Sequence, residues 1–255
     1  MPAARWFILT QGTMLKLLIT CEHGGNQIPS AYAALFENKQ EILQSHRGYD
    51  IGALELYEKL EDMADKAFCS TTSRLLVELN RSQHHKSLFS AITQSLPDKE
   101  KKTILKNYYF PYRNRIEELI QDLVMVGHRV LHISLHSFTP ILDGEVRKAD
   151  IGLLYDPKRS GEHTFCRLWK KELQDQQKEL LVRFNYPYLG IADGFATYLR
   201  KKFTDEQYIG IELEVNQKYA EEGGEAWLKL QQLIRRSLKN ALLQFSPEEK
   251  NRASA

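Results

Sequence analysis

The chain has 255 residues, 42% of them hydrophobic and 27% charged, a composition typical of a globular protein with one large domain or at most two. Its net charge is +2, with Lys and Arg nearly balanced by Asp and Glu, so we expect neither a nucleic acid nor an anionic membrane surface as partner. The three cysteines lie far apart without a CxxC motif, which argues against a disulfide scaffold and against a thiolate zinc site.

The beginning of the chain lacks the pattern of a targeting signal. Its apolar runs are short and are interrupted by Gln11, Gly12 and Lys16, unlike the core of a cleaved signal peptide. No run approaches the roughly 18 apolar residues that a transmembrane helix requires. We therefore expect a cytoplasmic protein without a membrane partner, and Met14 is a candidate for its natural first residue.

The first expected element is a buried strand over the apolar residues 15–20. After it come Glu22, His23 and a glycine pair, Gly24-Gly25, which is typical of a tight turn that exposes the backbone. This order delivers His23 to the edge of the sheet. A plain turn explains the glycines but not the two polar residues that precede them.

Three helices are expected next, over residues 31–44, 50–66 and 98–126, the last of which Pro111 can break. Asp50 heads the second helix, where a carboxylate is a good N-cap. We favour the interpretation that Asp50 also faces a functional site.

Between these helices, residues 75–79 are strand-like and are flanked by Arg74 and Arg81, with Asn80 beside Arg81. The arginines are either surface charges or a clamp for a carboxylate, because a guanidinium forms bidentate hydrogen bonds with a carboxylate. The polar, serine-rich residues 83–97 are expected to form a loop that covers the site.

The central expected strand spans residues 131–140 and has one apolar and one polar face. Leu131, Ile133 and Leu135 alternate with His132, Ser134 and His136. In open α/β sheets, ligands bind at the carboxyl ends of the strands, so His136 is well placed for chemistry. A buried histidine with a structural role is the alternative.

The second half of the chain is expected to alternate strands and helices, with strands at 150–155 and 208–216, helices at 162–181, 195–203 and 226–245, and a shaped loop at 185–194. Glu212 and Glu214 fall on one face of the later strand. Two such carboxylates are costly when buried and unpaired, so we expect either a solvated edge strand or a nearby metal or arginine.

Together, two imidazoles and a carboxylate are a usual zinc ligand set in hydrolases, with the fourth position open to water. His23, His136 and Glu214 lie at strand ends and Asp50 heads a helix. A second carboxylate is needed to move the proton from water to the leaving nitrogen. Glu214 fits that role, with Glu212 in reserve. Because these residues are widely separated, spacing alone does not establish the site.

Seven motifs, spread in order over residues 15–219, resemble the N-formylglutamate amidohydrolase family: CEHGGNQIP, YDIGALELYEKL, TSRLLVELNRS, SLHSFTP, RKADIGLLYDP, NYPYLGIADG and IELEVNQKY. The resemblance implies a zinc-dependent amidohydrolase with an α/β fold similar to the zinc carboxypeptidases, in which helices flank a central mixed, mostly parallel sheet. We expect a single domain over residues 1–255, with its core at about 15–245 and a frayed tail at 246–255.

Carried onto this sequence, the resemblance implies one zinc ion per chain, bound by His23, Asp50 and His136, although Glu22 competes with Asp50 as the acidic ligand. It implies Glu214 as the catalytic base. The residues implied to contact substrate are Arg74, Asn80 and Arg81, which would hold carboxylates, and Ser137, Tyr188 and Asp193 in the pocket. Glu78 stands where the family usually has Asp, which shifts a carboxylate by about 1.5 Å and leaves the substrate's identity open.

The expected activity is hydrolysis of the amide bond of a small N-acyl amino acid, with N-formyl-L-glutamate as the first candidate substrate. One alternative is a zinc amidase or peptidase that acts on a peptide or a cell-wall fragment. Another is a non-catalytic relative that binds a small acid. The sequence leaves the oligomeric state and the metal's identity open.

Overall fold

The computed structural model describes residues 14–245 of the chain. The expected frayed tail at 246–255 and the segment before Met14 lie outside the described residues. None of the helices within the described range is long and apolar enough to cross a membrane.

The centre of the fold is a six-stranded sheet with the strand order β2-β1-β3-β8-β6-β7. Four strands, β2, β1, β3 and β8, are parallel, whereas β6 is antiparallel to β8 and β7 is parallel to β6. A mixed, mostly parallel sheet flanked by helices confirms the predicted α/β class. The strands are β1 (Leu15–Cys21), β2 (Lys66–Cys69), β3 (Arg129–Phe138), β6 (Ile151–Leu154), β7 (Val182–Phe184) and β8 (Tyr208–Asn216), and a separate hairpin joins β4 (Ile141–Leu142) to β5 (Glu145–Val146).

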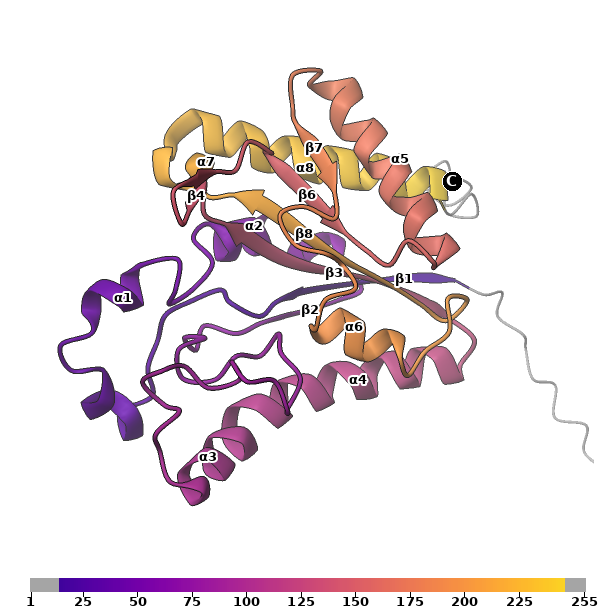
Figure 1. Ribbon diagram of the computed structural model, residues 1–255. Helices are drawn as coiled ribbons and strands as arrows, with labels where there is room; N and C mark the ends of the chain where they lie inside the picture. The colour runs from indigo at the N-terminus through magenta and orange to yellow at the C-terminus, as the bar shows by residue number, and fades with distance from the viewer. Residues whose placement is uncertain (1–13, 246–255) are drawn as a thin grey trace, which may run out of the picture.

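Helices cover both faces of the sheet (Figure 1). Helices α2, α5 and α8 lie on one face, and α4 and α6 lie on the other. The α-helices are α1 (Gln40–Gln44), α2 (Ala53–Leu60), α3 (Asp98–Ile104), α4 (Phe110–Met125), α5 (Ser160–Gln176), α6 (Phe195–Arg200), α7 (Lys218–Glu222) and α8 (Gly224–Phe245).

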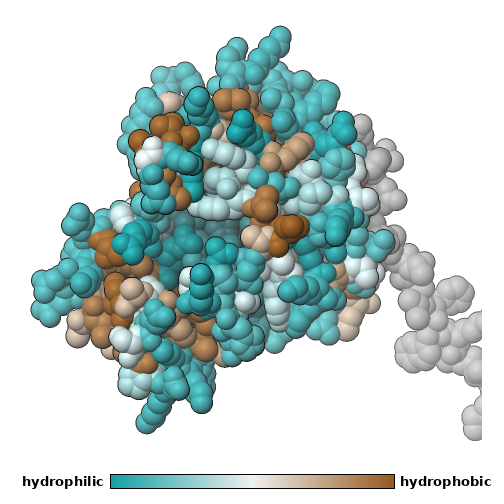
Figure 2. Space-filling model, viewed as in Figure 1, coloured by the Kyte–Doolittle hydropathy of each residue, from teal (hydrophilic) through white to brown (hydrophobic). Residues whose placement is uncertain are grey.

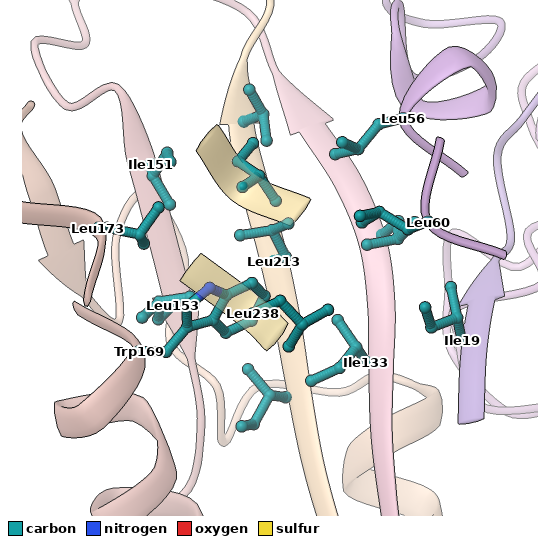
Figure 3. Close-up of a cluster of buried hydrophobic side chains, with 14 of the residues drawn as sticks. Ile19, Leu56, Leu60, Ile133, Ile151, Leu153, Trp169, Leu173, Leu213 and Leu238 are labelled. Carbon is teal, nitrogen blue, oxygen red and sulfur yellow. The ribbon is translucent and has the colours of Figure 1, made fainter. Parts of the chain in front are cut away.

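The main core lies between the sheet and the helices α2, α5 and α8 (Figure 3). Alternate residues of the central strands point to this face because side chains alternate along a strand. Ile19, Ile133 and Leu213 thus pack against Leu56, Trp169 and Leu238 of the three helices. This core fixes the register in which the strand ends present their polar residues.

The opposite face of the sheet is apolar under α4 and α6 and polar toward the carboxyl ends of the strands. Leu18, Val130 and Tyr208 pack with residues of these two helices. Further along the same face, Ser134 is paired with Glu212 and His136 with Glu214 in the β3–β8 register. Strand β8 lies between β3 and β6, so of the two alternatives for this strand the solvated edge strand is wrong.

Residues 75–79 do not form the predicted strand. The segment is a series of turns in which the backbone N–H of Leu76 donates to Ser73 and that of Glu78 donates to Leu88. Its apolar side chains are buried in a second hydrophobic cluster with Tyr32 and Phe36 of the 3₁₀ helix Ser30–Phe36. The apolar run is apolar because its side chains are buried and not because it is a strand. A short apolar run in a sequence does not by itself distinguish a strand from another buried segment.

Three helix predictions also need correction. Residues 31–44 form a 3₁₀ helix and the short α1 instead of one helix, and α2 begins at Ala53, so Asp50 does not cap it. The helix predicted to end at residue 66 gives way to the 3₁₀ helix Glu61–Met63 and then to β2. The helix predicted over 98–126 is not broken at Pro111; the chain widens into a π-helical turn, Leu105–Tyr109, just before it.

Candidate active site

Three side chains from three different elements meet at the carboxyl edge of the sheet. His23 follows β1, Asp50 precedes α2, and His136 lies near the end of β3. The backbone N–H of Asp50 donates to the carbonyl of His23 at 3.0 Å, which ties the two segments together. Oδ2 of Asp50 lies 3.2 Å from Nδ1 of His23 and 2.9 Å from Nδ1 of His136. All three residues are buried.

This trio fits a divalent metal ion by its donor chemistry. One ligand atom from each residue lies within 4.8 Å of the other two. Imidazole and carboxylate donors suit zinc and several other transition metals. The carboxylates that contact the two imidazoles are Asp50, Glu22 and Glu78, and Arg74 pairs with Asp50 and Glu78. When a metal ion takes the place of a proton on each imidazole, both rings are neutral; the three carboxylates and one guanidinium then carry two net negative charges, which a divalent cation balances.

Asp50 and Glu22 occupy different sides of His136. Asp50 lies on the Nδ1 side that is shared with His23, whereas Oε2 of Glu22 lies 3.3 Å from Nε2. Burial by itself raises the pKa of both carboxyls, but nearby positive groups lower them: His136 brings the pKa of Glu22 to about 2, and His23 and Arg74 bring that of Asp50 well below its ordinary value. Both residues are therefore carboxylates, and Asp50 is the one between the imidazoles.

Glu214 faces the same site from β8, directly opposite His136 in the strand register. It is 5% exposed, and its Oε2 atom has no hydrogen-bond partner among the described residues. Burial raises the pKa of Glu214 to about 8. Glu212 is more exposed, and Nδ2 of Asn80 donates to its Oε1 at 3.3 Å. Glu214 is thus the carboxyl with free bonding capacity in the site.

A cavity of about 170 Å³ opens over these residues. In the space-filling view, the surface is hollowed near the centre of the molecule and the hollow is bordered mostly by hydrophilic residues (Figure 2). Of the residues that the sequence singled out for catalysis, substrate contact or metal binding, all but Glu22, the competing acidic ligand, line this cavity. They are His23, Asp50, Arg74, Asn80, Arg81, His136, Ser137, Tyr188, Asp193, Glu212 and Glu214; Leu189 and Ala192 line it as well.

The two arginines differ in their partners. Arg74 Nη1 donates to Asp50 at 2.9 Å, and its Nε donates to Glu78 at 2.8 Å, so two carboxylates already balance its charge. Arg81 Nη1 donates to the backbone carbonyl of Asp193, and its guanidinium forms no ion pair with any residue between 14 and 245. Of the two, only Arg81 has an uncompensated charge to offer a ligand.

The remaining predicted contact residues are mostly engaged with the protein itself. Asn80 Oδ1 accepts from the backbone N–H of Phe195 at 2.7 Å, and the hydroxyl of Ser137 donates to the carbonyl of Ile51 at 2.7 Å. Tyr188 is 45% exposed, and its hydroxyl accepts from Arg147 at 3.2 Å. Asn80 and Ser137 therefore shape the cavity, and Tyr188 stands at its mouth.

The residues expected to cover the site, 83–97, contribute nothing to the cavity lining. Leu88, Phe89 and Ile92 of that segment pack instead into the second hydrophobic cluster. The loop at 185–194 takes that place, through Tyr188, Leu189, Ala192 and Asp193. The prediction gave weight to the serine-rich composition of 83–97 and overlooked these apolar side chains and Leu96, which anchor the segment in that cluster.

Ser134 and Tyr112 were not anticipated at the site. Ser134 Oγ lies 2.9 Å from Nε2 of His136, and Tyr112 donates to Glu22 at 3.1 Å. The strand period could have indicated Ser134, because it precedes His136 by two residues and shares its face. No sequence signal connects Tyr112, on α4, with Glu22 after β1.

Comparison with known proteins points to one family. The family model for N-formylglutamate amidohydrolase matches residues 15–220. The structure of gene product Atu2144 from Agrobacterium tumefaciens is similar with a TM-score of 0.72 at 25% identity, covering 88% of this chain and 90% of that chain. N-formylglutamate amidohydrolase from Ralstonia eutropha JMP134 shares the fold with a TM-score of 0.68 at 18% identity, covering 91% and 94%. No curated protein sequence matches significantly.

Proposed function

The chain belongs to the N-formylglutamate amidohydrolase family, and from this premise we propose that it is a zinc-dependent hydrolase of the amide bond in a small N-acyl amino acid. N-formyl-L-glutamate, which would yield formate and L-glutamate, is the first substrate to test. The observation that carries the proposal is the convergence of His23, Asp50 and His136 beneath a cavity that Glu214 also lines.

The proposed ligands of the zinc ion are Nδ1 of His23, Nδ1 of His136 and a carboxylate oxygen of Asp50, with one ion per chain. Asp50 is preferred to Glu22 because it is the carboxylate that both Nδ1 atoms approach. When bound, zinc supplies Lewis-acid polarisation of the scissile carbonyl and lowers the pKa of the attacking water to about 7.

Glu214 is the proposed general base and acid. Its Oε2 atom is buried without a hydrogen-bond partner among the described residues and lies across the strand pair from His136. In the proposed reaction, the ionised form of Glu214 accepts a proton from the attacking water and passes it to the leaving nitrogen as the bond between the acyl carbon and that nitrogen breaks, so that formate and a free amine result. Glu212 is the reserve candidate, but its carboxylate already accepts a hydrogen bond from Asn80.

Substrate binding is assigned chiefly to Arg81. Its uncompensated guanidinium at the cavity wall suits a substrate carboxylate. Arg74 and Asn80 are proposed to hold Asp50 and Glu212 in place beside the substrate. Ser137 and Tyr188 are proposed as walls of the pocket.

Two alternatives are less well supported by these contacts. A peptide or cell-wall fragment requires an open groove, but the cavity measures about 170 Å³, less than the few hundred Å³ typical of pockets for drug-sized ligands. A non-catalytic acid-binding relative would be expected to pair Glu212 and Glu214 with arginines. Neither carboxyl forms such a pair within the described part of the chain.

The test is an assay of the zinc-loaded protein with a panel of N-formyl and N-acetyl amino acids, in which formate or acetate and the free amine are measured. We expect turnover by the wild type and a loss of about 10²- to 10⁴-fold in kcat for Glu214→Gln. Glu118→Gln, an exposed change on α4, is the matched control and should keep full activity. A zinc-loaded wild type that cleaves no member of the panel would contradict the proposal.

A further inference from the structure

We propose that Glu22 and Glu78 are positioning residues that hold the imidazoles of His136 and His23 from behind, with both Nδ1 atoms directed at Asp50, and thereby set the protein's affinity for its metal ion. The inference rests on the metal site proposed above. It concerns two buried carboxylates that neither line the cavity nor lie between the imidazoles.

On the His23 side, Nε2 donates to Oε1 of Glu78. Glu78 is itself fixed from two directions. Arg74 contacts its Oε2 through Nε at 2.8 Å and through Nη2 at 2.6 Å, and the backbone N–H of Asn80 donates to Oε1 at 3.0 Å. Because Arg74 also binds Asp50, a single guanidinium couples the backing carboxylate of His23 to the proposed acidic ligand.

On the His136 side, Nε2 lies 2.9 Å from Oγ of Ser134 and 3.3 Å from Oε2 of Glu22. Ser134 donates to the same carboxylate oxygen at 2.5 Å, and Tyr112 donates to the other one at 3.1 Å. Glu22 has no exposed surface. Its three hydrogen-bonding neighbours leave it one defined orientation, in which it faces the back of the His136 ring.

These contacts matter for a metal because an imidazole has two nitrogens and only the unprotonated one can be a ligand. A carboxylate at Nε2 holds the proton there, leaves the Nδ1 lone pair free, fixes the plane of the ring and makes the ligand more basic. Both histidines have such a carboxylate, and both Nδ1 atoms converge on one oxygen of Asp50. Burying a carboxylate costs free energy, and the orientation of a metal-binding imidazole would explain why Glu22 and Glu78 are nevertheless buried.

A purely structural role for these carboxylates would change the stability of the fold without changing metal affinity. The decisive readout is therefore the dissociation constant of the metal, measured on protein stripped of metal and titrated with Zn²⁺ against a chromophoric chelator. The Co²⁺ absorption spectrum reports ligand geometry in the same samples. The variants are Glu22→Gln and Glu78→Gln, which keep the side-chain shape and remove the charge.

We expect each variant to bind zinc about 10- to 100-fold more weakly than the wild type. Glu162→Gln is the matched control: Glu162 is also a fully buried carboxylate, but it bonds to Arg200 and to the backbone of Asp156 and Gly210, away from the histidines. Its zinc affinity should equal that of the wild type, even if its unfolding temperature falls.

If either glutamine variant does not fold, Glu22→Asp and Glu78→Asp replace it. They keep the charge and withdraw the carboxylate from the imidazole by about 1.5 Å, so a smaller loss of affinity is expected. Folded variants at positions 22 and 78 that bind zinc as tightly as the wild type would overturn the inference and leave the metal site standing. A wild type that binds no metal would instead overturn the proposed function and this inference together.

Discussion

At the scale of single residues, the site separates two arginines that look equivalent in the sequence. Both flank the same apolar run, yet the side chain of Arg74 is 27% exposed and bonded to Asp50 and Glu78. The guanidinium of Arg81, at the cavity wall, has only a backbone carbonyl as partner among residues 14–245. A charge that two carboxylates already balance attracts a third one weakly. We therefore propose that Arg81 recognises the substrate and that Arg74 supports the acidic ligand Asp50 of the proposed metal site.

Arg81→Ala should consequently raise KM and leave kcat within a few-fold of the wild type. The loss of one charge-assisted hydrogen bond, worth about 1.5–3 kcal/mol, corresponds to about a 10- to 150-fold rise in KM. Arg81→Lys should recover part of the loss. Steady-state kinetics on the best substrate of the panel check this, and an unchanged KM in Arg81→Ala would show that another group reads the carboxylate.

How far the sequence predicted these residues depends on how local the determining contact is. His136 and Glu214 could be placed from the strand period, because alternation fixes the face and the strand end fixes the edge. The partners of Arg74 could not, because they depend on how the turns of residues 74–82 fold back on Asp50. Turns that are stabilised by tertiary packing leave no periodic signal.

At the scale of elements, the loop at 185–194 completes the cavity, and hydrogen bonds at Gly190 hold the loop in place. Its backbone N–H donates to Oδ1 of Asn185 at 2.9 Å, and its carbonyl accepts from Arg200 at 2.5 Å. A Cβ atom at this position would lie 2.5 Å from the carbonyl oxygen of Tyr155, closer than real contacts allow. Only glycine lets the loop lie this close to the end of β6.

We expect Gly190→Ala to displace this loop. Overpacking against a rigid backbone should lower the free energy of unfolding by about 1–3 kcal/mol, and KM should rise because the loop carries Tyr188 and Leu189 into the cavity wall. Gly127→Ala is the control: it pays a backbone strain at φ +87° but meets nothing within 4 Å. Urea denaturation and KM are measured for both variants. Gly190→Ala should change both quantities, whereas the control Gly127→Ala should lose stability while its KM stays constant.

The elements themselves were predictable where burial and periodicity agree. Strand β1 follows from its compact apolar run, β3 and β8 follow from the alternation of apolar and polar residues, and α8 follows from its apolar stripe at helical spacing. The short strands β2 and β7 were missed because each has only three or four residues and neither is a continuous buried apolar run, unlike the equally short β6. Short elements at the two edges of the sheet carry too few residues to show a period.

At the scale of the whole molecule, the buried polar face makes stability depend on pH through His132. Burial lowers the pKa of His132 from 6.5 to about 4, against the opposing charge of Glu22. The unfolded chain therefore takes up a proton at higher pH than the folded one. The stabilisation by His132 is complete above about pH 6.5 and is lost as the pH falls toward 4, by about 3 kcal/mol in all.

The measurement is urea denaturation of the metal-free wild type and of His132→Gln between pH 7.5 and pH 4.5. The difference in unfolding free energy between the two proteins should shrink by most of that amount as the pH falls, because the variant lacks the titrating group. The comparison cancels the other titrating groups, including His23 and His136, whose pKa values are raised. Parallel curves for the two proteins would contradict this role of His132.

The metal content of the purified protein is the most direct measurement of whether this fold is a metal hydrolase. Elemental analysis should find about one zinc per chain in the wild type and in His84→Ala, an exposed control, and almost none in His136→Ala. That result would place His136 among the ligands and join the His-Asp-His cluster to the proposed chemistry. A wild type that contains no metal and takes up none on addition of zinc would contradict the hydrolase mechanism, and a folded His136→Ala that keeps its full zinc would contradict the ligand assignment.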